Sequence, residues 1–276
     1  MAKKDDTLFI AAPQTRPVTF YIKGITPLIF NAPSQKAKHE LLLPKRKTAA
    51  DRAANLKHDP LAEYRASAYR HKDDTHPTRL FFPCGGWKKA MMTAALETGN
   101  ASKASIARLM WIEDYNVDIF GTPKLFMAMT RSADINKTPD IRTRAIVDQW
   151  CAKLSIRFII PKLNEQVVGN LLAGAGLMVA IGDWRQEKGS SNHGQFELLP
   201  DEAAFNEMAA RIGGREQQDA ALENPAMFDV DTEEMYTWYV EEVSRREQAG
   251  DAAAQNARRK RTQAQVAVNG PAPEEA

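Results

Sequence analysis

The sequence predicts an α/β fold, a sheet with helices packed on one face. Residues 18–23 and 152–160 alternate apolar and polar side chains with a period of two, which is typical of strands with one buried face. Residues 87–95 and 167–175 repeat apolar side chains at helical spacing instead. The order of these segments along the chain then decides which α/β fold is expected.

The first half of the predicted domain is interrupted by a basic segment. A strand over 18–24 directs Val18, Phe20 and Ile22 to one side, and a second apolar step follows at 25–30. Residues 31–79 are rich in Lys and Arg and poor in apolar side chains, so we expect a long insertion there. Apolar residues are frequent again from Leu80 onward. We expect a helix that begins near Trp87 and ends at Gly99.

The second half completes the pattern. Strands are expected at 117–119 and 124–129, followed by a polar, basic loop over 130–148. Residues 152–160 form the clearest strand, and Asn164 caps the next helix. A loop over 182–194 leads to a short last strand at 195–198.

This order is strand, helix, strand, strand, helix, strand, so we predict a ferredoxin-like or RRM-like βαββαβ core in an α+β domain. The expected organisation is an N-terminal arm (1–16), the domain (17–199) with its basic insertion (31–79) and glycine-rich loop, a C-terminal helical extension (200–247) and a disordered tail (248–276).

The composition of the chain excludes several classes of function. Lys+Arg total 37 against 35 Asp+Glu, so only the distribution of charge is informative. The two cysteines, Cys84 and Cys151, lie outside any zinc-ligand spacing, and no apolar stretch suits a signal peptide or a membrane helix. We therefore expect a cytoplasmic protein with no membrane association.

Motifs for nucleotide binding or hydrolysis are absent from the sequence, which lacks GxxxxGK[ST], GxSxG and a complete GxGxxG. The histidines show no HxxxH spacing either. We therefore predict a protein that is not an enzyme and has no catalytic residues, no metal ligands and no cofactor.

Three segments resemble the RAMP superfamily, the RNA-binding subunits of CRISPR effector complexes, and its backbone-forming subunits above all. They are Gly24-Ile25-Thr26-Pro27-Leu28, the proline–glycine turn with a lysine-bearing helix at 82–90, and the glycine-rich loop at 182–196. The Gly182-Asp183-Trp184-Arg185 start of that loop is also similar to single-protein phage or prophage relatives. The resemblance implies nucleic-acid binding, a thumb-like role for the insertion, and assembly of copies side by side along the strand.

Within this resemblance, the glycine-rich loop is the first candidate site. Its glycines let backbone N–H groups approach phosphate, and an aromatic ring can stack on an unpaired base. The alternative is a flexible connector whose tryptophan fills the core. The candidate residues of the loop are Trp184, Arg185, Lys188 and His193.

The other candidates are cations on the first and third core strands, in the insertion, on the first helix and in the 130–148 loop. If the two strands are adjacent, Tyr21, Lys23, Lys153 and Arg157 share a face not covered by helices, although an ordinary solvated face has the same pattern. The remaining candidates would contact phosphates, or are merely solvated: Lys45, Arg46, Lys47, Arg52, Lys88, Lys89, Arg142 and Arg144.

We therefore predict a non-catalytic protein that binds single-stranded DNA or RNA and forms homo-oligomers, in phage replication or recombination or in a CRISPR-like complex. Two alternatives stay open. One is a metal-independent endoribonuclease with His193 or a histidine of the insertion as general base. The other is an inhibitor or scaffold that docks on a host complex, and the C-terminal region is where a host or phage protein partner would bind.

Overall fold

The computed structural model describes residues 12–33, 58–97, 101–131, 139–188, 191–246 and 248. The chain divides into two compact units, residues 1–228 and 229–276. In the smaller unit a helix runs over 230–246, and the Asp229 carboxylate caps it by accepting from the Thr232 N–H at 2.8 Å. None of the helices in the described ranges has the length and apolar character needed to span a bilayer.

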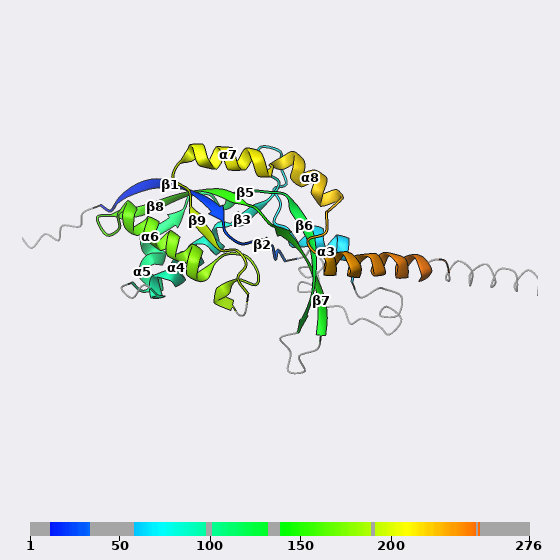
Figure 1. Cartoon of the computed structure of the whole chain (residues 1–276). Coiled ribbons are helices and arrows are strands. Elements are labelled where there is room, and N and C mark those ends of the chain that lie inside the picture. Colours follow the sequence, from blue (N-terminus) through cyan, green and yellow to red (C-terminus); the bar gives the residue numbers. More distant parts are fainter. Residues whose placement is uncertain are drawn as a thin grey trace, which may run out of the picture. The chain divides into compact units, whose positions relative to one another are not determined.

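The larger unit contains the predicted core (Figure 1). Its main sheet has the strand order β3-β5-β8-β1-β9, with β4 also paired to β8, and these pairs are antiparallel. With β1, β5, β8 and β9 as the four core strands and α4 and α6 as the two helices, this is the ferredoxin-like topology. The α+β prediction is confirmed. The bounds are β1 Gln14–Gly24, β3 Phe81–Pro83, α4 Cys84–Glu97, α5 Lys103–Leu109, β4 Met110–Ile112, β5 Asn116–Phe120, β8 Cys151–Ile160, α6 Glu165–Gly174 and β9 Phe196–Leu198.

The alternating pattern of the two central strands builds the core beneath the helices. Leu154, Ile156 and Phe158 of β8 are fully buried, and β1 pairs Phe20 with Leu154 and Ile22 with Ala152 on the same face. The predicted cap of α6 is confirmed as well, because the Asn164 side chain accepts from the Val167 N–H at 2.9 Å. Burial of apolar area on this face is the main term that stabilises the layer.

A second sheet, which the sequence did not predict, has the order β2-β7-β6. Its long β6–β7 hairpin extends away from the main sheet in Figure 1. The predicted loop over 130–148 is therefore wrong in its second half, where Thr143 and Ala145 are buried on one face of a strand and Arg142 and Arg144 lie half-buried on the other. The sequence does not indicate this strand, because charged residues alternate with its buried ones and give the segment the composition of a loop. The bounds are β2 Leu28–Ile29, β6 Pro123–Arg131 and β7 Pro139–Val147.

Helix α3 (Pro60–Ser67) lies on β7 and belongs to the region predicted as an insertion. Its Tyr64 side chain has no exposed surface, and the hydroxyl donates to the Ala221 carbonyl at 2.9 Å. Asp59 caps the helix by accepting from the Ala62 N–H at 3.1 Å. Residues 58–79 are thus part of the packed unit, whereas the most basic stretch, 34–57, lies outside the described residues.

Two more helices follow β9, and one changes the expected sheet surface. Helix α7 (Glu202–Ile212) packs on β1 and β8, with Phe205 and Met208 against buried Cys151. Helix α8 (Arg215–Glu223) contacts β6. The sheet face opposite α4 and α6 is therefore partly covered, contrary to the prediction of a face without helices.

Candidate nucleic-acid interface

The glycine-rich loop is attached to the turn that joins β1 and β2. The Asp183 N–H donates to the Ile29 carbonyl at 2.9 Å, and the Gly194 N–H donates to the Pro27 carbonyl at 2.8 Å. Gly182 and Gly194 have φ angles of 89° and 75°, and a Cβ at either would collide with a backbone carbonyl. These two glycines therefore let the two ends of the loop lie against the rest of the unit.

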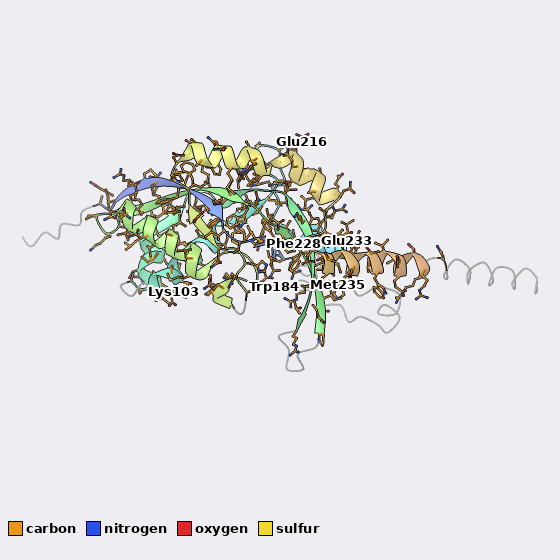
Figure 2. All side chains as sticks on the ribbon, in the orientation of Figure 1. Lys103, Trp184, Glu216, Phe228, Glu233 and Met235 are labelled. Atoms are coloured by element: carbon orange, nitrogen blue, oxygen red, sulfur yellow. The ribbon has the colours of Figure 1, made fainter. Side chains whose placement is uncertain are left out.

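Trp184 packs on the second sheet, close to Phe228 (Figure 2). Its ring meets Phe126 edge to face at a centroid distance of 5.5 Å, and it meets His193 at 6.2 Å. Its backbone has a φ of 51°, a left-handed conformation that is uncommon outside glycine. The ring is half-buried, so one part supports the sheet and the other part remains at the surface.

The same face of the second sheet carries Arg142 and Arg144 of β7, paired across the ladder with Ala128 and Phe126. Arg144 is the more enclosed, with 21% of its side chain exposed, and its Nε lies 3.8 Å from an Asp183 carboxylate oxygen. That distance is too long for a hydrogen bond, and the buried Nε has no hydrogen-bond partner among the described residues. The structure thus brings Arg142, Arg144 and Trp184 together.

The electrostatics of Arg144 follow from this position. Burial lowers the pKa of its guanidinium, the positive charge of Arg142 adds to the shift, and the negative charges of Asp183 and Glu63 oppose it. Within the described ranges Arg142 has no ion-pair or hydrogen-bond partner. Asp183 and Glu63 thus compensate part of the charge of Arg144, while Arg142 adds a second positive charge that favours an anion.

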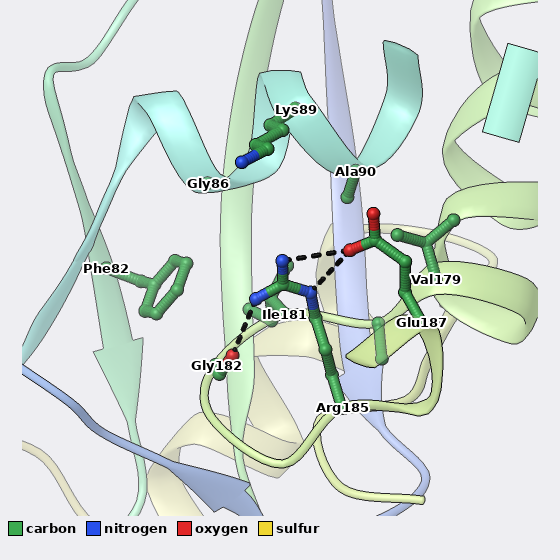
Figure 3. Close-up of a pocket in the computed structure, with 10 residues that line it drawn as sticks. Phe82, Gly86, Lys89, Ala90, Val179, Ile181, Gly182, Arg185 and Glu187 are labelled. Atoms are coloured by element: carbon green, nitrogen blue, oxygen red, sulfur yellow. Dashed lines mark hydrogen bonds and ion pairs between the residues drawn. The ribbon is translucent and has the colours of Figure 1, made fainter. Parts of the chain in front are cut away.

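A hollow separates the loop from the first turns of α4 (Figure 3). The Arg185 guanidinium lies in it and is held by Glu187 at 2.9 Å and by the Gly182 carbonyl at 3.1 Å, so this arginine organises its own loop. Lys89 lines the α4 side and is exposed, next to half-buried Lys88. Neither lysine has a carboxylate partner among the residues that the structure describes.

The strand face has the predicted adjacency but is occupied by internal contacts. Tyr21 and Lys153 are directly paired between β1 and β8, as expected. Tyr21 packs on Phe205 of α7 at 5.6 Å between ring centroids, and burial raises the pKa of its hydroxyl. Each cation of this face has a carboxylate partner: Lys23 with Glu197 at 3.0 Å, Lys153 with Glu202 at 2.8 Å and Arg157 with Glu113 at 2.7 Å.

The remaining candidates divide between described and undescribed residues. His193 lies beside Ser191 and Trp184, and burial lowers the pKa of its imidazole. Lys188 ends a short helix, Gln186–Lys188, but its side chain lies outside the described set. The four candidates of the basic stretch also lie outside the described residues: Lys45, Arg46, Lys47 and Arg52.

Sequence reasoning missed two features of this unit. One is Asp183, the acidic neighbour of Arg144, because nothing in the sequence indicates that the loop reaches β7. The other is a cluster in which His71 and His76 meet Asp118 of β5. The two histidines are five residues apart, but the carboxylate comes from a strand far along the chain, so their spacing alone carries no ligand signal.

Comparison with known proteins assigns no family. No protein-family model matches the chain, and neither does any curated protein. Solved structures do match, among them the one titled "Cryo-EM structure of the Type III-B Cmr-beta bound to cognate target RNA", with 11% identity and a TM-score of 0.31. The match covers 67% of this chain and 59% of that chain, so this chain spans less than two thirds of its length. A likeness this distant assigns neither family nor function, and the RAMP resemblance stays a prediction from sequence.

Proposed function

We propose that the chain binds single-stranded nucleic acid, DNA or RNA, through the phosphate backbone on the face of the second sheet that carries Arg142, Arg144 and Trp184. The observation that carries the proposal is a pair of neighbouring arginines: Arg144 is 21% exposed and lies no closer than 3.8 Å to the Asp183 carboxylate, and Arg142 has no ion-pair or hydrogen-bond partner among the described residues. A phosphate oxygen would accept from the exposed N–H groups of the two guanidiniums and neutralise part of their positive charge.

Three further features support a strand of nucleic acid rather than a small anion. The half-buried Trp184 leaves part of an aromatic ring at the surface beside the arginines, where an unpaired base can stack. Lys88 and Lys89 on α4 add cations that have no carboxylate partner within the described ranges. The sequence of 34–57 contributes 7 Lys and Arg against 2 acidic residues.

The proposed binding is of low sequence specificity and non-catalytic. Arginine contacts to phosphate position a protein on nucleic acid but do not read its bases. The resemblance of the sequence to RAMP proteins supports binding of RNA or DNA by several copies side by side, in a CRISPR-like complex or in phage replication or recombination.

The test is fluorescence anisotropy of the full chain with matched single-stranded DNA, single-stranded RNA and duplex probes over a salt series. We expect both single strands to bind more tightly than the duplex, with affinity that falls steeply as salt rises. The Arg142→Ala/Arg144→Ala variant should bind weakly, whereas Lys153→Ala/Arg157→Ala should bind like the wild type. Absence of binding to any probe at low salt would overturn the proposal, and equal losses in the two variants would reject this face as the site.

A further inference from the structure

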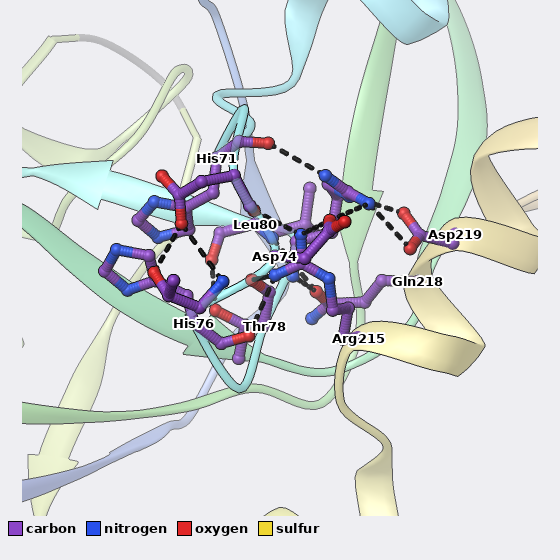
Figure 4. Close-up of polar contacts among 11 residues, drawn as sticks. His71, Asp74, His76, Thr78, Leu80, Arg215, Gln218 and Asp219 are labelled. Atoms are coloured by element: carbon purple, nitrogen blue, oxygen red, sulfur yellow. Dashed lines mark hydrogen bonds and ion pairs between the residues drawn. The ribbon is translucent and has the colours of Figure 1, made fainter.

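The segment between α3 and β3 places two histidines against β5 (Figure 4). His71 Nε2 lies 2.8 Å from Asp118 Oδ1, and His76 Nδ1 lies 3.2 Å from the same oxygen. The three ligand atoms all lie within 4.8 Å of one another. His71 has 2% of its side chain exposed, Asp118 has 24% and His76 has 37%, so the cluster reaches from the interior to the surface.

Hydrogen bonds from α8, and from Arg79 within the segment itself, hold the backbone of this segment. Arg215 donates to the carbonyl of His76 at 2.8 Å, and Arg79 donates to the carbonyl of His71 at 3.0 Å. The Gln218 side-chain oxygen accepts from the Arg79 N–H at 2.7 Å. Figure 4 shows these contacts on the side of the segment away from the imidazoles. The histidine positions are therefore supported by a network that does not use their rings, as a preorganised ligand site requires.

We infer that His71 Nε2, His76 Nδ1 and Asp118 Oδ1 form a binding site for a divalent transition-metal ion, with Zn²⁺ the best fit. Imidazole and carboxylate are ordinary zinc ligands, at about 2.0–2.2 Å from the ion. Two such ligands on a tetrahedral ion are about 3.3 Å apart by that geometry, close to the separations of 2.8 and 3.2 Å found here. Three protein ligands leave the fourth position for water or for an oxygen of a bound molecule.

The side chains around the cluster agree with ligation. The Thr78 hydroxyl lies 3.1 Å from Asp118 Oδ1 and helps to orient the carboxylate. The two imidazoles stack at 3.6 Å and 11°, so joint ligation requires the His76 ring to tilt out of the stack. The exposure of His76 leaves room for that rotation.

The test uses the full chain after treatment with a chelator and dialysis. We expect calorimetric titration with Zn²⁺ to give about one ion per chain, and Co²⁺ to give the visible absorption of a tetrahedral N/O site. His76→Ala and Asp118→Asn should each weaken Zn²⁺ binding at least about tenfold, because each removes one of three ligands. His76 is chosen over His71 because its partial exposure makes the variant more tolerant, and circular dichroism checks the fold.

His58→Ala is the matched control. His58 also contacts two carboxylates, Glu63 at 2.9 Å and Asp140 at 3.2 Å, but through opposite ring nitrogens, so the contacts do not converge on one point. Its loss should leave Zn²⁺ binding unchanged. The inference is overturned if the wild type takes up no stoichiometric Zn²⁺, or if His76→Ala and Asp118→Asn bind it as tightly as His58→Ala. Arg142→Ala/Arg144→Ala should retain Zn²⁺ whether or not it binds nucleic acid, which separates this result from the proposed function.

Discussion

The two sheets of the larger unit carry similar numbers of candidate cations but differ in how those cations are compensated. On the main sheet, Lys23, Lys153 and Arg157 each contact a carboxylate within 3.0 Å. On the second sheet, Arg142 has no partner among the described residues and Arg144 reaches Asp183 only at 3.8 Å. A cation already paired with a carboxylate gains less from a phosphate, because the exchange replaces one ion pair by another. The comparison teaches that the partners of a cation matter more for binding than the number of cations.

The largest expected effect comes from removing the uncompensated pair. Arg142→Ala/Arg144→Ala should lower the affinity for single-stranded nucleic acid about 100-fold, since two charge-assisted contacts of about 1.4 kcal/mol each are lost. The slope of log affinity against log salt should also become less steep by about 1.4, since each phosphate contact on a single strand contributes about 0.7. Anisotropy titrations at three or more salt concentrations measure both quantities. A loss of affinity without a change in slope would mean that the arginines do not contact phosphate.

The second prediction concerns the aromatic support of the second sheet. Trp184→Ala should lower the free energy of unfolding by about 2 kcal/mol, less than for a fully buried tryptophan because the ring is half-buried. Urea denaturation followed by circular dichroism measures the change. Trp238→Ala is the control, because Trp238 is 65% exposed and should change the stability by less than about 0.5 kcal/mol. Equal effects of the two variants would contradict the packing of Trp184 on Phe126.

A smaller effect should follow from freeing the paired cations of the main sheet. Glu113→Gln/Glu202→Gln removes the partners of Arg157 and Lys153 and should raise the affinity for single strands about threefold, within the range of exposed ion pairs. The same anisotropy assay measures the gain, with Glu233→Gln/Glu234→Gln of the smaller unit as a charge-matched control. If the affinity rises as much in the control, the effect is one of net charge and the pairing explanation fails.

The smallest expected effect is a pH dependence of the unfolding free energy that comes from His193. Burial lowers the pKa of His193, so the unfolded chain, with an ordinary histidine pKa near about 6.5, binds the proton more readily than the folded chain. Above about pH 6.5 His193 is neutral in both states and does not disfavour folding. As the pH falls below that value, the unfolded state takes up the proton and the free energy of unfolding decreases. His193→Gln should therefore show a smaller decrease in unfolding free energy between pH 7.5 and pH 5.5 than the wild type. An identical decrease in the two proteins would mean that His193 is not desolvated.

The parts of the fold that the sequence predicted correctly depend on local patterns. The alternation in β8, the helical spacing of Trp87 and Met91, and the Asn164 cap each follow from neighbouring residues and are confirmed. The β7 strand was missed because the side chains that alternate with its buried face are charged, so the 130–148 segment has the composition of a loop. Tyr64 was missed as a core residue for a similar reason, since it lies in a segment rich in charge.

The sequence by itself determined the order of the core elements, the buried face of each central strand and the presence of a glycine-rich loop. Only the tertiary structure decided that α7 covers the Tyr21 and Lys153 face, that Asp183 lies near Arg144, and that Asp118 meets His71 and His76. The physical reason is the distance along the sequence over which each property is determined. Backbone geometry makes the period of a strand or helix a property of nearby residues, whereas the pairing and desolvation of a charge depend on side chains that folding brings from distant segments.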